Sequence, residues 1–125
     1  MVSSYPTNKE RSGLMLYIQH GGKIRLTRGD TAMLKVSITN DITGNEYTVA
    51  EDDTMVLTIK KDISDTDVTV QKTLVGESTF HIEPNDTRSL EFGKYIYDVQ
   101  LNKANGEVYT IIEPITFEIL QEVTC

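Results

Sequence analysis

Few side chains in this sequence are of the types that carry nucleophilic or metal chemistry. The two histidines, His20 and His81, are far apart, and neither has a second His or a Cys at the spacing of a zinc site. Cys125 is the only cysteine, so a disulfide within the chain is excluded. The sequence contains neither a Gly-rich phosphate loop after a strand nor a serine on a nucleophile elbow. It therefore predicts a protein that is not an enzyme and holds no cofactor.

Two runs of carboxylates are the remaining candidates for chemistry. They consist of Glu51, Asp52 and Asp53 and of Asp62, Asp65 and Asp67. Calcium is bound by several oxygens that converge from a loop with spaced ligands, usually around a Gly. Neither run has this spacing, so we predict two solvated acidic loops and expect no metal at either.

Arg28, Gly29 and Asp30 form the tripeptide that integrin ligands display on an exposed loop. Here the tripeptide lies between two segments that alternate like strands, and Gly and Asp are residues that favour tight turns. A turn between two strands is therefore the prediction for these residues.

The net charge of −7 argues against nucleic acid as a partner, because a protein that follows a phosphate backbone is usually basic. The charge is uneven: residues 1–30 carry five basic and two acidic side chains, and the remainder of the chain carries the acidic excess. Such asymmetry indicates either an arm that docks on a neighbouring copy or a short solvated terminus.

The longest uninterrupted apolar run extends from Leu14 to Ile18. It is far shorter than the roughly 20 residues of a membrane-spanning helix, and no charged start leads into an apolar stretch with a cleavage site. No signal peptide and no membrane contact are therefore predicted.

Apolar residues alternate with polar ones along most of the chain. Between Thr31 and Thr39 the even positions are apolar and, apart from Met33, the odd positions are polar. This period of two is typical of a strand with one buried face. The pattern recurs in seven further segments: Ile24/Leu26, Met55/Leu57/Ile59, Val68/Val70/Leu74, Phe80/Ile82, Tyr95/Tyr97/Val99/Leu101, Val108/Thr110/Ile112 and Ile115/Phe117/Ile119.

Helices are nearly absent from the prediction. Only Pro84 to Leu90 has the composition for a single helical turn. Since parallel neighbours usually need crossover helices, the sheets are expected to be mainly antiparallel. Asn105 and Gly106 predict a two-residue hairpin turn between Leu101 and Val108, with a separate turn at Glu113 and Pro114.

The expected fold is all-β, a single antiparallel immunoglobulin-like β-sandwich of seven to nine strands over residues 23–125. Residues 1–22 would form an N-terminal arm or an extra edge strand. The predicted core consists of Leu34, Val36, Leu57, Ile59, Tyr95, Tyr97, Val99 and Phe117.

One stretch carries the immunoglobulin expectation. Leu90, Gly93, Tyr95 and Tyr97 resemble the corner written L-x-D-x-G-x-Y-x-C, in which a Tyr ties its hydroxyl to the preceding corner. Tyr95 takes the corner position, and Tyr97 stands where the second disulfide Cys would be. Because Trp is absent as well, the resemblance is to disulfide-free relatives of that fold. Ordinary core aromatics on one strand face are the alternative interpretation.

Motifs spread over residues 23–124 resemble one family. They are Arg28-Gly29-Asp30-Thr31, Phe80 to Thr87, Leu90, Gly93 to Leu101, Gly106, Thr110-Ile111-Ile112, Phe117-Glu118-Ile119 and Glu122-Val123-Thr124. The chain is similar to Ig-like sandwich domains of structural proteins from bacteriophages and prophages of Gram-positive bacteria, including the N-terminal domain of phage baseplate upper proteins. Residues 1–22 match nothing in that family. Baseplate upper proteins continue into long further segments, so a stand-alone module or a fragment is expected here.

The resemblance implies a virion structural or assembly protein of the tail, baseplate or head decoration. Such a protein acts through contacts with other copies of itself, as a homo-oligomer, and with other virion proteins. It would be located in the virion, or in the cytoplasm of the host bacterium during assembly. The alternatives are a carbohydrate- or receptor-binding β-sandwich module at a phage or cell surface, and a non-phage adhesin repeat.

The candidate partner contacts are apolar residues of the N-terminal segment and one nearby cation. They are Leu14, Leu16, Tyr17, Ile18 and Arg25. An exposed apolar run on a monomer is typical of an interaction surface. The run is therefore expected either to pair as an edge strand within its own sandwich or to lie on a neighbouring copy, with basic residues facing that copy's acidic surface.

Overall fold

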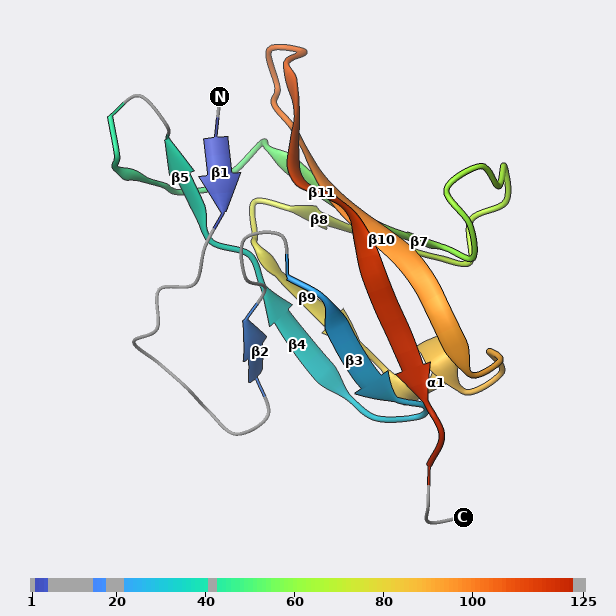
Figure 1. The fold of residues 1–125 in the computed structure, drawn as a ribbon. Helices are drawn as coiled ribbons and strands as arrows, with labels where there is room; N and C mark the ends of the chain where they lie inside the picture. The colour runs from blue at the N-terminus through green and yellow to red at the C-terminus, as the bar shows by residue number, and fades with distance from the viewer. Residues whose placement is uncertain (1, 5–14, 18–21, 41–42, 123–125) are drawn as a thin grey trace.

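The computed structural model describes residues 2–4, 15–17, 22–40 and 43–122. These residues form a mostly β fold (Figure 1). The elements, in chain order, are β1 (Val2–Ser4), β2 (Met15–Tyr17), β3 (Ile24–Thr27), β4 (Ala32–Lys35), β5 (Ile38–Asn40), β6 (Glu46–Tyr47), β7 (Thr54–Lys60), β8 (Val70–Val75), β9 (Thr79–Ile82), α1 (Pro84–Thr87), β10 (Gly93–Asn102) and β11 (Val108–Leu120). The predicted all-β class is confirmed. The described strands outnumber the predicted seven to nine. β6 lies outside the predicted segments, and β1 and β2 lie in residues 1–22, for which an arm or an extra edge strand was predicted; β2 is an edge strand beside β4. In the described part of the chain, no helix has the length and apolar character needed to cross a membrane.

The largest sheet has five strands in the order β3-β11-β10-β7-β8. Its neighbours are antiparallel except β3 and β11, which run parallel with Ile24 opposite Phe117. β2 and β4 form a second parallel pair. The expectation of a single antiparallel sandwich is wrong at these two pairs. A parallel neighbour arises here without a crossover helix because β3 and β11 lie nearly a chain length apart, and the intervening strands make the connection.

Two three-stranded sheets, β2-β4-β9 and β1-β5-β6, complete the fold. The segment from Thr31 to Thr39, predicted as one strand, is divided between them. Residues 36–39 are all buried, so the alternation of faces stops there. Val36 donates its backbone N–H to the Ser78 carbonyl at 2.9 Å, and the chain then passes from the β9 pairing to the β6 pairing.

One core joins the five-stranded sheet to the β2-β4-β9 sheet. All eight residues of the predicted core are buried, which confirms that part of the prediction. Tyr97 and Phe117 meet edge to face, with ring centroids 6.0 Å apart. The Tyr97 hydroxyl donates to the Gly22 carbonyl at 2.7 Å, so the largest buried side chain also has its polar atom bonded.

β11 is one long strand where two strands with a turn at Glu113 and Pro114 were predicted. Its register against β10 shifts twice, between Tyr97 and Val99 and between Val99 and Gln100. Such bulges insert extra residues into one strand and bend it. Ile111 and Ile112 are consequently both buried, and Val108 is exposed, contrary to the predicted alternation. Pro114 is tolerated because it lies at a bulge.

The hairpin predicted at Asn105 and Gly106 is present, but its turn is longer than two residues. Gly106 donates its N–H to the Lys103 carbonyl at 2.9 Å, and Lys103 donates to the Glu107 carbonyl at 2.8 Å. These bonds enclose a three-residue loop in which Gly106 has φ 96°. A three-residue loop typically places a Gly at such a left-handed position. The single helical turn predicted after Ile82 is confirmed as α1.

Candidate interaction face

The sequence-predicted partner contacts are placed only in part. Leu14 and Ile18 lie outside the described residues. Leu16 and Tyr17 belong to β2, whose backbone pairs with β4 of the same chain. Arg25 is exposed on β3, and its guanidinium lies 3.3 Å from a carboxylate oxygen of Glu118 on the neighbouring strand. Contact of these residues with another molecule stays a prediction.

Arg28 is bound within its own chain. Its guanidinium lies 3.0 Å from a Glu122 carboxylate oxygen, donates to the Leu90 carbonyl at 3.2 Å, and stacks 4.1 Å from the centroid of the Phe92 ring. Asp30 closes the turn through its N–H to the Thr27 carbonyl. The predicted turn at this tripeptide is confirmed, and its arginine is not presented as a free side chain.

The two acidic runs do not act as clusters. Glu51 and Asp52 are exposed, whereas Asp53 is buried. Asp62 accepts hydrogen bonds from the backbone and hydroxyl of Ser64. Among the described residues, no group of three or more His, Cys, Asp and Glu side chains could hold a metal ion. The absence of a metal stays a prediction.

Asp53 is buried and is the centre of a polar network that the sequence did not indicate. Its carboxylate accepts hydrogen bonds from the Tyr47 hydroxyl and from the Ala50 N–H, and Lys103 lies 4.9 Å from the centroid of the Tyr47 ring. Burial alone would raise the pKa of Asp53, but the bonds from Tyr47 and from the backbone of Ala50 and Ala104, with the Lys103 charge, hold that pKa below its ordinary value. Burial and the bond to Asp53 raise the pKa of Tyr47. This network fastens the β10–β11 hairpin to the loop before β7.

The outer side of the five-stranded sheet is the broadest surface built from regular elements. Register places Val75, Thr54, Asn102 and Val108 in one transverse row across β8, β7, β10 and β11. The next row is Thr73, Val56, Gln100 and Thr110, and in the third row Gln71 and Thr58 adjoin Asp98 of β10. We call the surface the charge-free face; it consists of Thr54, Val56, Thr58, Gln71, Thr73, Val75, Gln100, Asn102, Val108 and Thr110.

None of these ten residues carries a charge, although 25% of the residues in the chain do. All ten are exposed or half-buried, with Val75 61% and Val108 58% exposed. Their chain neighbours Met55, Leu57 and Leu101 are buried, because adjacent residues in a strand point to opposite faces. Depletion of charge is the compositional mark of the centre of a protein interface.

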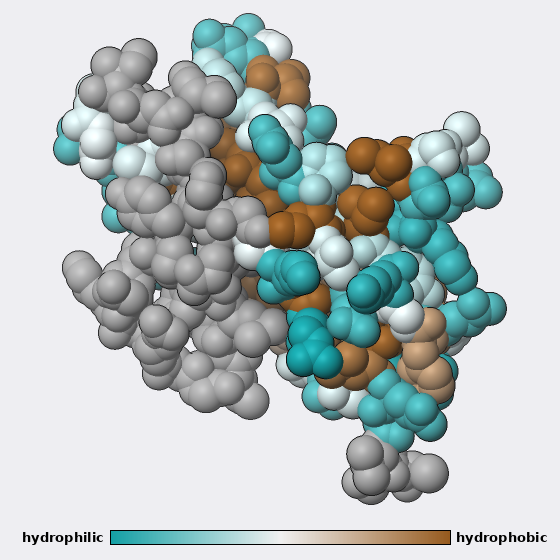
Figure 2. Space-filling model, in the orientation of Figure 1, coloured by the Kyte–Doolittle hydropathy of each residue, from teal (hydrophilic) through white to brown (hydrophobic). Residues whose placement is uncertain are grey.

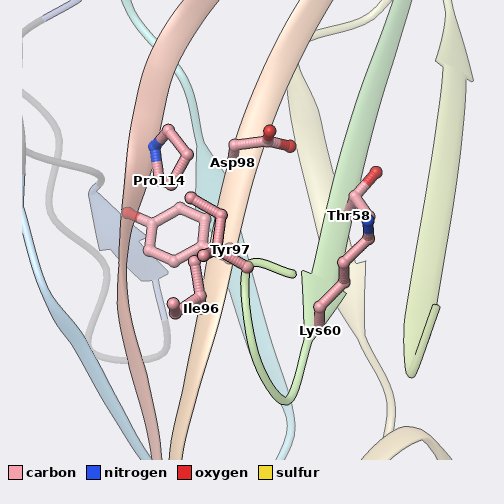
Figure 3. A pocket seen from close by; sticks show the side chains of 7 residues that line it. Thr58, Lys60, Ile96, Tyr97, Asp98 and Pro114 are labelled. Carbon is pink, nitrogen blue, oxygen red and sulfur yellow. The ribbon is translucent and has the colours of Figure 1, made fainter. Parts of the chain in front are cut away.

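Charged side chains begin in the third row, where Asp98 of β10 lies opposite Thr58, and continue with Lys60 farther along β7. At one end Lys60 and Asp98 line a shallow depression of about 70 Å³ with Thr58, Ile63, Ile96, Tyr97 and Pro114. Figure 3 shows it at the strands β7, β10 and β11, with Asp98 directed from β10 toward β7. Burial raises the pKa of Asp98, and the Lys60 charge opposes that change. Small-molecule sites occupy roughly 300–1,000 Å³, so this depression is too small to enclose a drug-sized ligand.

Figure 2 shows apolar side chains in several small groups between hydrophilic ones on the side of the molecule drawn there. The charge-free face is distinguished by its lack of charge and not by a continuous apolar patch, since only three of its ten residues, Val56, Val75 and Val108, are apolar. The signal in the sequence was the polar half of each alternation: apart from Asp98, the polar outward positions of these rows are Thr, Gln and Asn. Only the pairing register of β8, β7, β10 and β11 shows that these positions are neighbours on one face.

Neither the protein-family models nor the curated proteins include a match to this chain.

Proposed function

We propose that this chain is an immunoglobulin-like module of a bacteriophage or prophage particle, and that it acts through protein–protein contacts. The family resemblance described above supports the lineage. The charge-free face supports the mode of action, and it is the observation that carries the proposed function.

The strand order supports the immunoglobulin-like arrangement. In that fold strands C, F and G share one sheet, which variable-type domains extend by a further strand, and strands B and E lie in the other sheet. β7, β10 and β11 correspond to C, F and G, with β8 as the added strand, while β4 and β9 correspond to B and E.

The tyrosine corner gives independent support. The Tyr95 hydroxyl donates to the Glu91 carbonyl at 2.9 Å, four residues upstream and next to the turn that follows α1. The immunoglobulin corner has this same bond, from a Tyr at the start of strand F to the backbone a few residues before it. Any buried tyrosine needs a partner for its hydroxyl, so the bond by itself does not separate the two interpretations. Its partner, the backbone four residues upstream, is the one that the corner uses, and this supports the corner interpretation of Tyr95.

The binding-module alternative has less support. Sugar sites present exposed aromatic rings, but the Tyr47 hydroxyl is bound by Asp53 and its ring is covered by Lys103. Tyr109 donates its hydroxyl to Glu107 at 3.0 Å. Among the tyrosines whose side chains are described, Tyr95 and Tyr97 are buried.

The test is incorporation into particles. Prophage induction in the source bacterium, followed by purification of particles and mass spectrometry, should find the chain in multiple copies per particle. Thr73→Glu places a charge on the charge-free face and should reduce incorporation, whereas Thr66→Glu, the same change at an exposed loop position, should not. Absence of the chain from particles, with no terminase, portal or tape-measure genes beside its gene, would overturn the proposal.

A further inference from the structure

We infer that the depression at Asp98 is the place where one arginine side chain of a partner protein binds this chain. The inference rests on the proposed function, since it names the chemistry that a partner brings to the contact. The depression adjoins the charge-free face, because Asp98 lies opposite Thr58 in its third row. A partner that covers the face therefore reaches this carboxylate as well.

The Asp98 carboxylate is half-buried and has no partner of its own. It lies at the bulge between Tyr97 and Val99, and Pro114, which also lines the depression, has no N–H to donate. Among the described residues no group donates a hydrogen bond to this carboxylate, and only the charge of Lys60 acts on it. Burial accordingly raises its pKa. A carboxylate that has lost water without gaining a donor is stabilised by a cation that reaches it.

Lys60 is the one cation that lines the depression, and it is held elsewhere. Its ammonium donates to the Asp65 carbonyl at 2.9 Å, in the loop between β7 and β8. It forms no hydrogen bond with Asp98 and acts on it only through its charge. Figure 3 shows the Asp98 carboxylate directed from β10 toward β7. The position beside this carboxylate is therefore open to a cation from another molecule.

The walls of the depression favour arginine over lysine. Ile63, Ile96 and Pro114 are apolar, and Ile63 is 63% exposed. A guanidinium is planar and more weakly hydrated than an ammonium, so it can lie against apolar side chains while it donates two hydrogen bonds to one carboxylate. A volume of about 70 Å³ admits one side-chain head group, although it is too small for a drug-sized ligand.

The charge of the whole chain acts in the same direction. Its net charge of −7 attracts a basic partner and increases the rate of encounter. The charge-free face beside the depression holds no cation that would repel the arginine. The contact would thus combine one ion pair at Asp98 with uncharged side chains around it.

The experiment is an NMR titration of the full chain with N-ethylguanidinium, the head group of arginine, at constant ionic strength. The amide signals of Thr58, Ile96 and Asp98 should shift and saturate, with a dissociation constant of about millimolar order. N-ethylurea has nearly the same shape without the charge and should leave these signals unchanged. Ethylammonium, the analogue of lysine, should bind more weakly; equal binding of the two cations would overturn the preference for arginine.

Three variants isolate the carboxylate. Asp98→Asn should raise the dissociation constant roughly tenfold or more. Asp52→Asn removes the same charge from an exposed loop and should change it little. Lys60→Gln removes the opposing cation and should lower the dissociation constant. Circular dichroism and thermal unfolding check that each variant folds, and if Asp98→Asn does not, the direction of the Lys60→Gln effect is the test.

The outcomes separate this inference from the proposed function. The inference is overturned by the absence of saturable shifts at the depression, by equal effects of N-ethylurea and N-ethylguanidinium, or by equal affinities of Asp98→Asn and Asp52→Asn. If the chain is found in particles and Asp98→Asn is incorporated as well as wild type, the inference is also overturned and the proposed function stands. Binding of N-ethylguanidinium that depends on Asp98 supports the arginine site, even where absence from particles and from phage gene clusters overturns the proposed function.

Discussion

Tyr97 has the largest fully buried side chain of the core, and its hydroxyl must have a hydrogen-bond partner there. Tyr97→Phe keeps the ring against Phe117 but leaves the Gly22 carbonyl without its donor. We expect a loss of about 1–2 kcal/mol in the free energy of unfolding, and about 3–5 kcal/mol for Tyr97→Ala, which also leaves a cavity. Urea unfolding measures both. Equal stabilities of Tyr97→Phe and Tyr97→Ala would contradict this account of the core.

The same residue predicts an alkaline response. Burial raises the pKa of Tyr97 above its ordinary value. Above about pH 10 the tyrosine ionises in the unfolded chain and stays protonated in the fold, so stability falls with rising pH. One such proton corresponds to about 1.4 kcal/mol per pH unit. Urea unfolding between pH 8 and pH 11 should show a shallower fall in Tyr97→Phe than in wild type; parallel curves would exclude Tyr97 as the group responsible.

Asp53 predicts the opposite response at acid pH. Its folded pKa is lowered although burial alone would raise it, so its contribution is present above the unfolded pKa of about 3.9 and is lost as the pH falls through the folded pKa. Asp53→Asn should cost roughly 1–3 kcal/mol at neutral pH. The difference from wild type should shrink below about pH 4. Thermal unfolding across this range tests it, and Asp52→Asn removes the same charge from the exposed neighbour as a control.

Among the elements, the turn between β8 and β9 packs on the loop before β7. Gly76 has φ 72°, and a Cβ there would lie 3.1 Å from the Glu51 carbonyl oxygen. Gly44 has nearly the same φ, 76°, and nothing within 4 Å of such a Cβ. Gly44→Ala should cost about 1 kcal/mol for the left-handed backbone alone. Gly76→Ala should cost about 2 kcal/mol, because the loop must also shift. Equal losses of unfolding free energy in Gly44→Ala and Gly76→Ala, measured by chemical unfolding, would mean that the loop before β7 moves away from the added Cβ at no cost.

The elements also show where the pattern of alternation fails as a guide. It predicts β7 and β10 well, because β7 pairs in regular register with both β8 and β10, and this pairing keeps one face of both strands buried along their length. It fails in β11, where bulges reverse the faces around Ile111 and Ile112. It also fails between β4 and β5, where the chain changes partner strands. A bulge or a change of partner strand depends on how two strands pair. It cannot be read from the alternation of residues in one strand alone.

For the molecule as a whole, net charge predicts how cation binding depends on salt. A chain with a net charge of −7 attracts N-ethylguanidinium, and salt screens that attraction. The Debye length falls from about 30 Å at 0.01 M salt to about 8 Å at 0.15 M. NMR titrations across this range should therefore show weaker binding at higher salt. Binding that does not change with salt would indicate that the apolar walls of the depression, and not charge, hold the ligand.

Local pattern was enough to predict the all-β class, the eight core residues, the single helical turn and the position of the β10–β11 hairpin. These features depend on periodicity and turn chemistry, and both can be read from a short segment of sequence without knowing its neighbours in the fold. The parallel pairing of β3 with β11, the polar network around Asp53 and the charge-free face emerged only from the folded arrangement. Each of these joins residues from distant segments. Their adjacency follows from register and sheet order, and small shifts in pairing would place different side chains together.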